Sequence, residues 1–286
     1  MKNVRFLLFA TAVAAFFSAC NNEENLNDHS GEIQLNMLYP GQESRATDTA
    51  FENSDPIGVY VTAADALLQL GGNEVNNELF TYNGSSWTSQ RKVYWNKGTH
   101  NVYAYYPYSK DVNEIENYQF SVQEDQSSAQ NYTRSDFMWA SASAITASNN
   151  PVPMQFSHKM SNVIVELVRG ETFEGEIPTT AEVYLYSTTT ASLIDLSTGD
   201  VTKDSYAGEG TIKCRKLSNT KFTAIVVPQS ITSRRPLVEV IVDNVSYLME
   251  GKISYRPGMR HTITVTLDKN PEQIKIDIGG KVEGWN

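Results

Sequence analysis

Short segments rich in β-branched and aromatic residues, separated by turn-forming residues, recur along this sequence and restrict it to an all-β fold. A spacing of about 8–12 residues between such segments is typical of antiparallel β-sandwiches. Only residues 63–70 have a pattern that favours a short helix. Strands are expected at 57–61, 79–82, 87–88, 93–95, 100–106, 162–168, 182–186, 191–196, 211–213, 222–227, 237–242, 245–250 and 261–267. We therefore predict an antiparallel β-sandwich fold.

Two sharp turns are predicted in the first half of the chain. Asn83-Gly84 lies between two expected strands, and this dipeptide favours a hairpin because both residues tolerate positive φ. Asn96-Lys97-Gly98 lies between the next two expected strands and predicts a second hairpin. Pro107 then ends its strand, since proline has no backbone N–H to donate to a neighbour.

The chain has 286 residues, which is enough for two domains that each have their own core. A low-complexity stretch rich in Ser, Ala, Asn and Pro occupies 141–153 and is the expected boundary. We therefore expect an N-terminal β-sandwich domain at 46–150 and a C-terminal one at 151–286. A leader at 1–19 and a spacer with a first strand at 20–45 precede them.

The first twenty residues predict export from the cytoplasm. Lys2 and Arg5 form a basic start, an apolar run follows at 6–17, and two small residues precede Cys20. The apolar run is too short to span about 30 Å of hydrocarbon as a permanent helix. A cysteine at this place resembles the lipobox of bacterial lipoproteins, in which the thiol is acylated, for example with palmitate. The alternative is an ordinary cleaved signal peptide that a cysteine happens to follow.

The charge and the cysteine content exclude several classes of protein. A formal net charge of −10 argues against a nucleic-acid partner, because such binding requires clustered Lys and Arg. The chain has two cysteines, so lipid on Cys20 leaves Cys214 without a disulfide partner. Cys214 is then expected to be a small buried apolar residue, and the fold must be held by packed apolar cores.

Recognisable spacings for catalysis or metal binding do not occur in the sequence. His29, His100, His158 and His261 are scattered singly, whereas metal ligands usually recur at short spacings. No nucleophile elbow, dinucleotide-binding glycine motif or phosphate-binding loop is present. Paired carboxylates for glycoside cleavage need no proximity in sequence, so a carbohydrate-active enzyme stays an alternative. We expect a non-enzymatic protein with no cofactor and no metal.

The two ends of the mature chain carry similar strands. Residues 32–37 and 273–278 both alternate polar and apolar side chains, the period-2 pattern of a half-buried strand. Burying three such side chains contributes roughly 5–9 kcal/mol before ordering costs, at about 1.5–3 kcal/mol each. We therefore expect that either strand can occupy the same groove at an open sheet edge. Their apolar stripes are Ile33, Leu35 and Met37 in the first, and Ile274, Ile276 and Ile278 in the second.

Five pieces of the chain, taken in order, resemble the fimbrillin family, the Mfa-like subunits of type V pili of Gram-negative anaerobes. Each piece is short, but their order behind a lipobox makes the resemblance fairly specific. The pieces are Ser44-Arg45-Ala46, Ile57-Gly58-Val59-Tyr60, the aromatic run at 103–108, Phe156-Ser157-His158-Lys159-Met160, and 257–265.

The resemblance implies an all-β fold of two tandem transthyretin-like (Ig-like, Greek-key) antiparallel β-sandwich domains. It also implies export as a lipoprotein to the cell outer membrane, and then cleavage between Arg45 and Ala46 by an arginine-specific protease at the cell surface. Loss of the propeptide at 20–45 opens a groove, which the donor strand at 272–286 of another fimbrial subunit fills. The subunit is thereby part of a surface fimbrium, with adhesion to host or bacterial ligands. Whether it is a stalk, tip or minor subunit stays open.

The main alternative is a surface lipoprotein that binds glycans and does not polymerise. The aromatic run Tyr103-Ala104-Tyr105-Tyr106-Pro107-Tyr108 is the feature that favours it, because exposed rings can stack on sugars. Alternating tyrosines on a strand more often form core on one side and rim on the other. A glycan binder is expected to stay monomeric and to keep residues 20–45.

Overall fold

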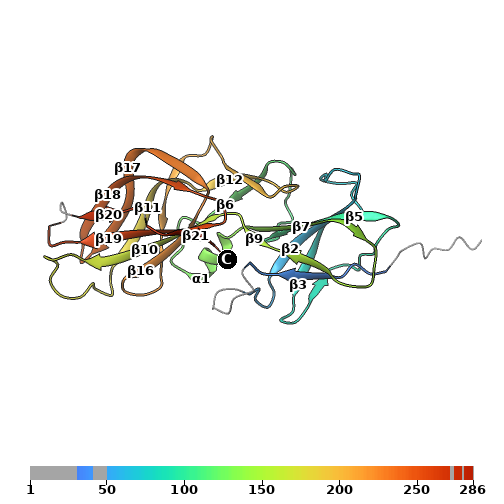
Figure 1. Ribbon diagram of the computed structural model, residues 1–286, viewed down its shortest axis with the longest axis horizontal. Helices are drawn as coiled ribbons and strands as arrows, with labels where there is room; N and C mark the ends of the chain where they lie inside the picture. The colour runs from blue at the N-terminus through green and yellow to red at the C-terminus, as the bar shows by residue number, and fades with distance from the viewer. Residues whose placement is uncertain (1–30, 41–49, 271–273, 279, 286) are drawn as a thin grey trace, which may run out of the picture.

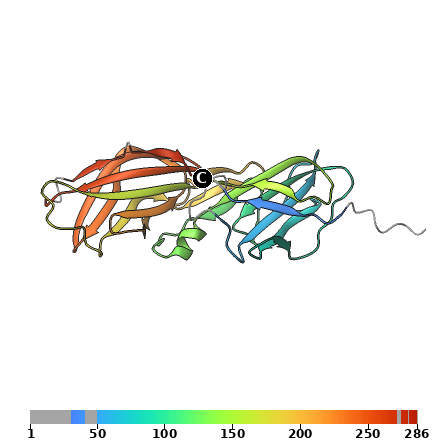
Figure 2. The ribbon, with the colours of Figure 1, turned by 60° about the horizontal axis from the view of Figure 1, so that its bottom comes forward.

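The computed structural model describes residues 31–40, 50–270, 274–278 and 280–285, and nearly all of its regular elements are strands. Two packed units lie end to end along the long axis (Figure 1), and the rotated view shows the same elongated arrangement (Figure 2). The prediction of an all-β fold is confirmed.

The first unit is built around a six-stranded antiparallel sheet. The strands, in spatial order, are β4 (Trp87–Ser89), β3 (Val75–Tyr82), β2 (Pro56–Ala63), β5 (Thr99–Tyr106), β7 (Met138–Thr146) and β9 (Ser157–His158). A second, two-stranded sheet pairs β1 (Leu35–Leu38) with β8 (Val152–Gln155). Apolar side chains from both sheets form one continuous core.

Strand β2 is apolar on both faces, and this places it in the middle of its sheet. Ile57, Val59 and Val61 are fully buried and belong to the core of the first unit. Tyr60 lies on the opposite face, where its ring stacks on Tyr105 at 6.5 Å between centroids. Both tyrosines belong to the core of the second unit, so the sheet of the first unit takes part in the junction between the units.

The second unit is a sandwich of two larger sheets with a third, smaller one beside it. One sheet contains β15 (Arg215–Lys216), β16 (Lys221–Val226), β10 (Ser161–Arg169), β19 (Met259–Leu267), β20 (Lys275–Asp277) and β21 (Val282–Gly284). The facing sheet contains β14 (Glu209–Lys213), β11 (Glu182–Thr189), β17 (Gln229–Val242) and β18 (Val245–Tyr255). The small sheet contains β13 (Asp200–Lys203), β12 (Ala191–Asp195) and β6 (Tyr118–Ser121).

Two strand pairs are parallel, which the antiparallel prediction did not include. They are β1 with β8 and β10 with β19. Parallel neighbours need a crossover connection rather than a tight turn. In the second unit the chain passes through the facing sheet as the β17–β18 hairpin. It then returns to the first sheet and places β19 beside β10.

The two cores draw on segments from both sides of residue 150, the expected domain boundary. Residue 150 lies in the connection between β7 and β8, and both of these strands belong to the first unit. Strand β6 precedes residue 150 but pairs with β12 of the second unit. The chain therefore passes between the two cores more than once.

Two local predictions are wrong and one is confirmed. Residues 93–95 do not form a hairpin with β5, because their backbone bonds residues 31–33 instead. Ala63 ends β2 and residues 64–70 form a turn and an irregular loop, and the helix in the described part of the chain is α1 (Ala129–Arg134). The turn at Asn83-Gly84 is confirmed, with Gly84 at a φ of 91°. Within the described ranges, no helix has the length and apolar character needed to span a bilayer.

Cys214 is buried in the second unit, as predicted. Burial raises the pKa of its thiol, so the reactive thiolate is scarce at ordinary pH. In protein that starts at Asn21, Cys214 is the one cysteine left. We expect its reaction with a thiol reagent at pH 8 to be about 100-fold slower in the native protein than in urea. Equal rates in the two states would contradict the buried position.

Candidate functional site

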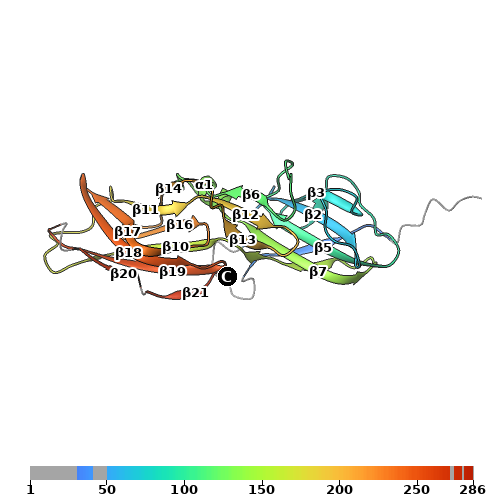
Figure 3. The same ribbon diagram turned by 90° about the horizontal axis from the view of Figure 1, so that it is seen from above.

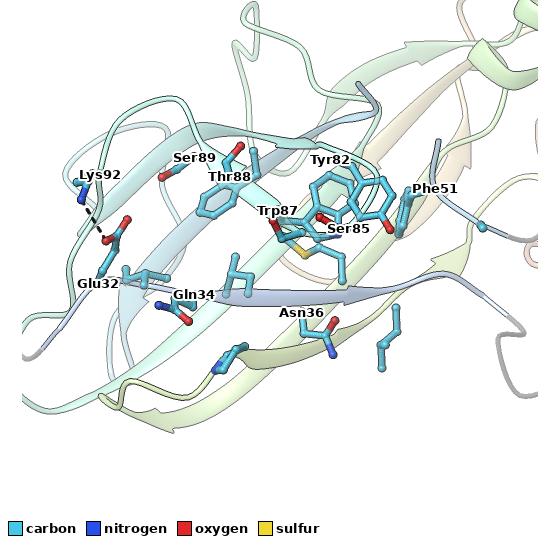
Figure 4. Close-up of a pocket in the computed structure, with 18 residues that line it drawn as sticks. Glu32, Gln34, Asn36, Phe51, Tyr82, Ser85, Trp87, Thr88, Ser89 and Lys92 are labelled. Carbon is cyan, nitrogen blue, oxygen red and sulfur yellow. Dashed lines mark ion pairs between the residues drawn. The ribbon is translucent and has the colours of Figure 1, made fainter. Parts of the chain in front are cut away.

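Strand β1 lies along the core of the first unit with its apolar stripe pointing inward (Figure 4). Ile33, Leu35 and Met37 are 4%, 6% and 5% exposed, whereas Gln34 and Asn36 between them are exposed. The period-2 pattern read from the sequence is therefore the burial pattern of the strand. These three side chains form part of the core and not a surface patch.

The backbone of β1 is held along one edge by β8. Leu35 faces Val152 and Met37 faces Met154 in a parallel ladder of four residues. The bonds include Val152 N–H to Gln34 O at 2.9 Å. Upstream, Ile33 N–H donates to Val93 O at 2.9 Å. The backbone of the first strand is thus held by a short ladder of hydrogen bonds, although its three apolar side chains are buried.

A cavity of about 850 Å³ lies beside β1, on the side away from β8. Phe80, Tyr82 and Trp87 of β3 and β4 line its far wall, and Phe51 closes one end (Figure 4). Glu32 and Lys92 form an ion pair of 3.6 Å that also lines the cavity. Among the described strands β1 pairs with β8 alone, and residues 31–33 just upstream are bonded to residues 93–95. We use the name first-strand seat for the site that residues 33–38 occupy, which is bordered by β8 and by this cavity.

The chain leaves and re-enters the first-strand seat at one place. The ring of Tyr39, just after β1, lies 5.2 Å from the ring of Phe51. The predicted cleavage site at Arg45 and Ala46 belongs to the connection between these two rings, and it lies outside the described residues. The predicted lipidation site at Cys20 also lies outside them.

The predicted donor strand is placed on the second unit, away from the first-strand seat. Strand β20 pairs antiparallel with β19, with Ile276 opposite Val265. Ile274, Ile276 and Ile278 are half-buried against the core of the second unit. Figure 3 shows β20 and β21 along the side of β19. The structure therefore does not bring the two stripes together in one chain.

Gly251, which the sequence did not single out, lies against the predicted donor strand at Ile278. A Cβ at Gly251 would lie 2.1 Å from Cδ1 of Ile278, so a larger residue there would require the end of the Ile278 side chain to move. Gly251 stands in β18 between alternating buried and exposed residues. An isolated glycine inside a strand pattern indicates close approach by another segment, and this signal could have identified Gly251 from the sequence.

The site has the chemistry of strand binding. The apolar core beneath β1, the aromatic side chains that line the cavity and the ladder with β8 suit an extended peptide. In the tyrosine run at 103–108, Tyr105 and Tyr106 are buried and Tyr103 and Tyr108 are half-buried. Burial raises the pKa of Tyr106 and, with the charge of Asp136, that of Tyr39. In the described part of the chain, no three His, Cys, Asp or Glu residues gather as a metal site would require.

Comparison with known proteins agrees with this architecture. Residues 44–285 match the family described as fimbrillin-like. A Bacteroides ovatus protein designated a fimbrium tip subunit, Fim1C, is 29% identical over 192 residues, which is 58% of this chain and 35% of that protein. The chain thus spans about a third of that relative's length.

Solved structures show the same fold. A Bacteroides ovatus protein described as a cell adhesion protein aligns with a TM-score of 0.72 and 21% identity, covering 89% of this chain and 97% of that one. A Bacteroides uniformis protein of the same description aligns with a TM-score of 0.68 and 20% identity, covering 90% and 98%. These relatives are described as adhesion or fimbrial proteins and not as enzymes. The chain belongs to the fimbrillin-like family.

Proposed function

We propose that this chain is a fimbrial subunit that is exported as a lipoprotein, processed after Arg45 and assembled by donor-strand exchange. Lipid on Cys20 tethers the precursor to the outer membrane, and an arginine-specific protease cuts between Arg45 and Ala46 at the cell surface. The cut frees β1 from the connection to the rest of the first unit. A strand from 272–286 of a neighbouring subunit then fills the first-strand seat, and the fibre contributes to adhesion to host or bacterial surfaces.

The observation that supports this most is that the apolar side chains of β1 are deeply buried, while its ladder of backbone hydrogen bonds is short. Three core side chains contribute roughly 5–9 kcal/mol, while the backbone is held by the four-residue ladder with β8 and by the bonds of residues 31–33 to residues 93–95. Loss of β1 would leave the edge of β8 unpaired and part of the apolar core in water. An edge in that state binds another extended segment strongly. The cavity beside β1 also gives an incoming strand room to enter before β1 has fully left.

The donor strand has the matching chemistry and a less complete site of its own. Ile274, Ile276 and Ile278 recur at the same spacing as the buried stripe of β1. They are only half-buried where they rest, whereas the stripe of β1 is buried. Transfer to a vacated first-strand seat therefore buries additional apolar surface, and this surface favours the exchange.

Limited proteolysis with an arginine-specific protease tests the proposal on protein that starts at Asn21. We expect one cut after Arg45, seen by mass spectrometry, followed by a ladder of oligomers on a native gel. Arg45→Ala is the matched control, because it removes the cut and leaves β1 and β20 intact. A cut protein that stays monomeric would contradict strand exchange. It would instead favour the glycan-binding alternative.

A further inference from the structure

The junction between the two units holds a small cluster of side chains from three distant parts of the sequence. His158 of β9 is stacked on Trp285, with ring centroids 3.8 Å apart and planes 3° apart. The edge of the Tyr39 ring faces the same imidazole at 5.7 Å and 78°. Asp136 fixes the imidazole, with its carboxylate oxygens 3.0 and 2.9 Å from Nδ1 of His158. His158 and Trp285 are 5% and 8% exposed, and Tyr39 is half-buried at the outside of the cluster.

The two outer members of this cluster belong to the two segments that strand exchange would move. Tyr39 directly follows β1, and Trp285 directly follows β21. Trp285 is also held by its backbone, because its N–H donates to Gly258 O at 2.9 Å. The close-lying β21 and β9 are visible at the middle of the molecule (Figure 1). Both segments that the exchange would move therefore pack against His158, the first through Tyr39 and the second through Trp285.

We propose that the His158–Trp285 stack is a clasp that keeps β20 and β21 on their own unit while Tyr39 is in place. Tyr39 packs against the imidazole and shields it from water. Loss of Tyr39 together with β1 exposes one side of His158, weakens the seat of Trp285, and frees the C-terminal strands to leave β19. The consequence for assembly rests on the proposed function: a subunit would offer its donor strand only after its own first strand has been removed.

The clasp requires that the two segments are coupled in both directions. A coupling free energy between two sites is reciprocal, so weakening either contact must loosen the other segment. Two independent contacts on His158 would produce no such effect, because β1 and β21 lie in different sheets and share no backbone bond. This difference makes the inference testable without any protease.

Hydrogen exchange on uncut protein that starts at Asn21 measures the coupling directly. We expect Tyr39→Ala to raise the exchange rate of peptides covering 275–285 at least fivefold, and Asn36→Ala, an exposed position of β1, to leave it unchanged. We expect Trp285→Leu to speed exchange in β1 in return. If Tyr39→Ala unfolds the first unit, protection is lost throughout that unit. The exchange of β1 in Trp285→Leu then decides whether the two segments are coupled.

The outcomes separate the clasp from the proposed function. Unchanged exchange of β1 in Trp285→Leu, with the rest of the protein protected as in wild type, would overturn the clasp. Loosened strands in both variants, combined with no oligomers after cutting at Arg45, would support the clasp and contradict strand exchange. Oligomers after cutting, combined with no coupling between the segments, would support strand exchange and contradict the clasp.

Discussion

Ile276→Asp is expected to abolish assembly of the cut protein while leaving its fold almost unchanged. Ile276 is half-buried on the second unit, so a carboxylate there can turn toward water with a modest loss of stability, about 1–2 kcal/mol. In a vacated first-strand seat the same side chain would enter a position as buried as that of Leu35 or Met37. An unpaired charge in such a place is strongly unfavourable. Native gels of the cut protein should therefore show monomer only.

Two controls sharpen the test of Ile276→Asp. Lys275→Asp introduces the same carboxylate one residue away, on the exposed face of β20, and should assemble as wild type does. A mixture of cut wild-type protein with cut Ile276→Asp should give shorter oligomers, because the variant can accept a strand but cannot donate one. Assembly of cut Ile276→Asp alone would exclude this strand as the donor.

Leu35→Asp is expected to destabilise the uncut protein severely and to have no effect on the product of cutting. Leu35 is 6% exposed in the core of the first unit, and its replacement removes an apolar contact and buries a charge. Loss of a buried leucine alone typically costs about 2–5 kcal/mol, and an unpaired buried carboxylate adds several more. Thermal unfolding of the uncut variant should show a clearly lowered midpoint for the first unit.

The same substitution also tests whether β1 leaves. Once residues up to Arg45 are gone, the variant and wild-type proteins have the same sequence and should form the same oligomers. Asn36→Asp is the matched control, since it places a carboxylate on the exposed face of the same strand. If Leu35→Asp impairs oligomers formed after a complete cut, β1 has stayed bound, and the proposed exchange is wrong.

Local sequence patterns were sufficient to locate most strands and the turn at Asn83-Gly84. A period of two in hydrophobicity follows from strand geometry alone, so the buried stripe of Ile33, Leu35 and Met37 could be read without knowing its neighbours. Buried apolar runs such as β2 and β10 were equally clear. The positive φ of the turn is likewise a property of its own residues.

The partner of each strand was decided by the tertiary structure. Residues 93–95 have a strand pattern and a turn after them, yet they pair with residues 31–33, because strand pairing depends on which edges the packed cores leave free. The parallel positions of β1 and β19 arise in the same way.

The features of the candidate site also divide into those that local sequence patterns predict and those that depend on tertiary packing. The two apolar stripes and the buried state of Cys214 follow from local sequence, since the period and polarity of residues are local properties. The contact of Ile278 with Gly251 and the meeting of Tyr39 and Trp285 at His158 depend on the folded arrangement. Contacts between residues so far apart in the sequence depend on the packing of whole sheets, and no local pattern carries that information.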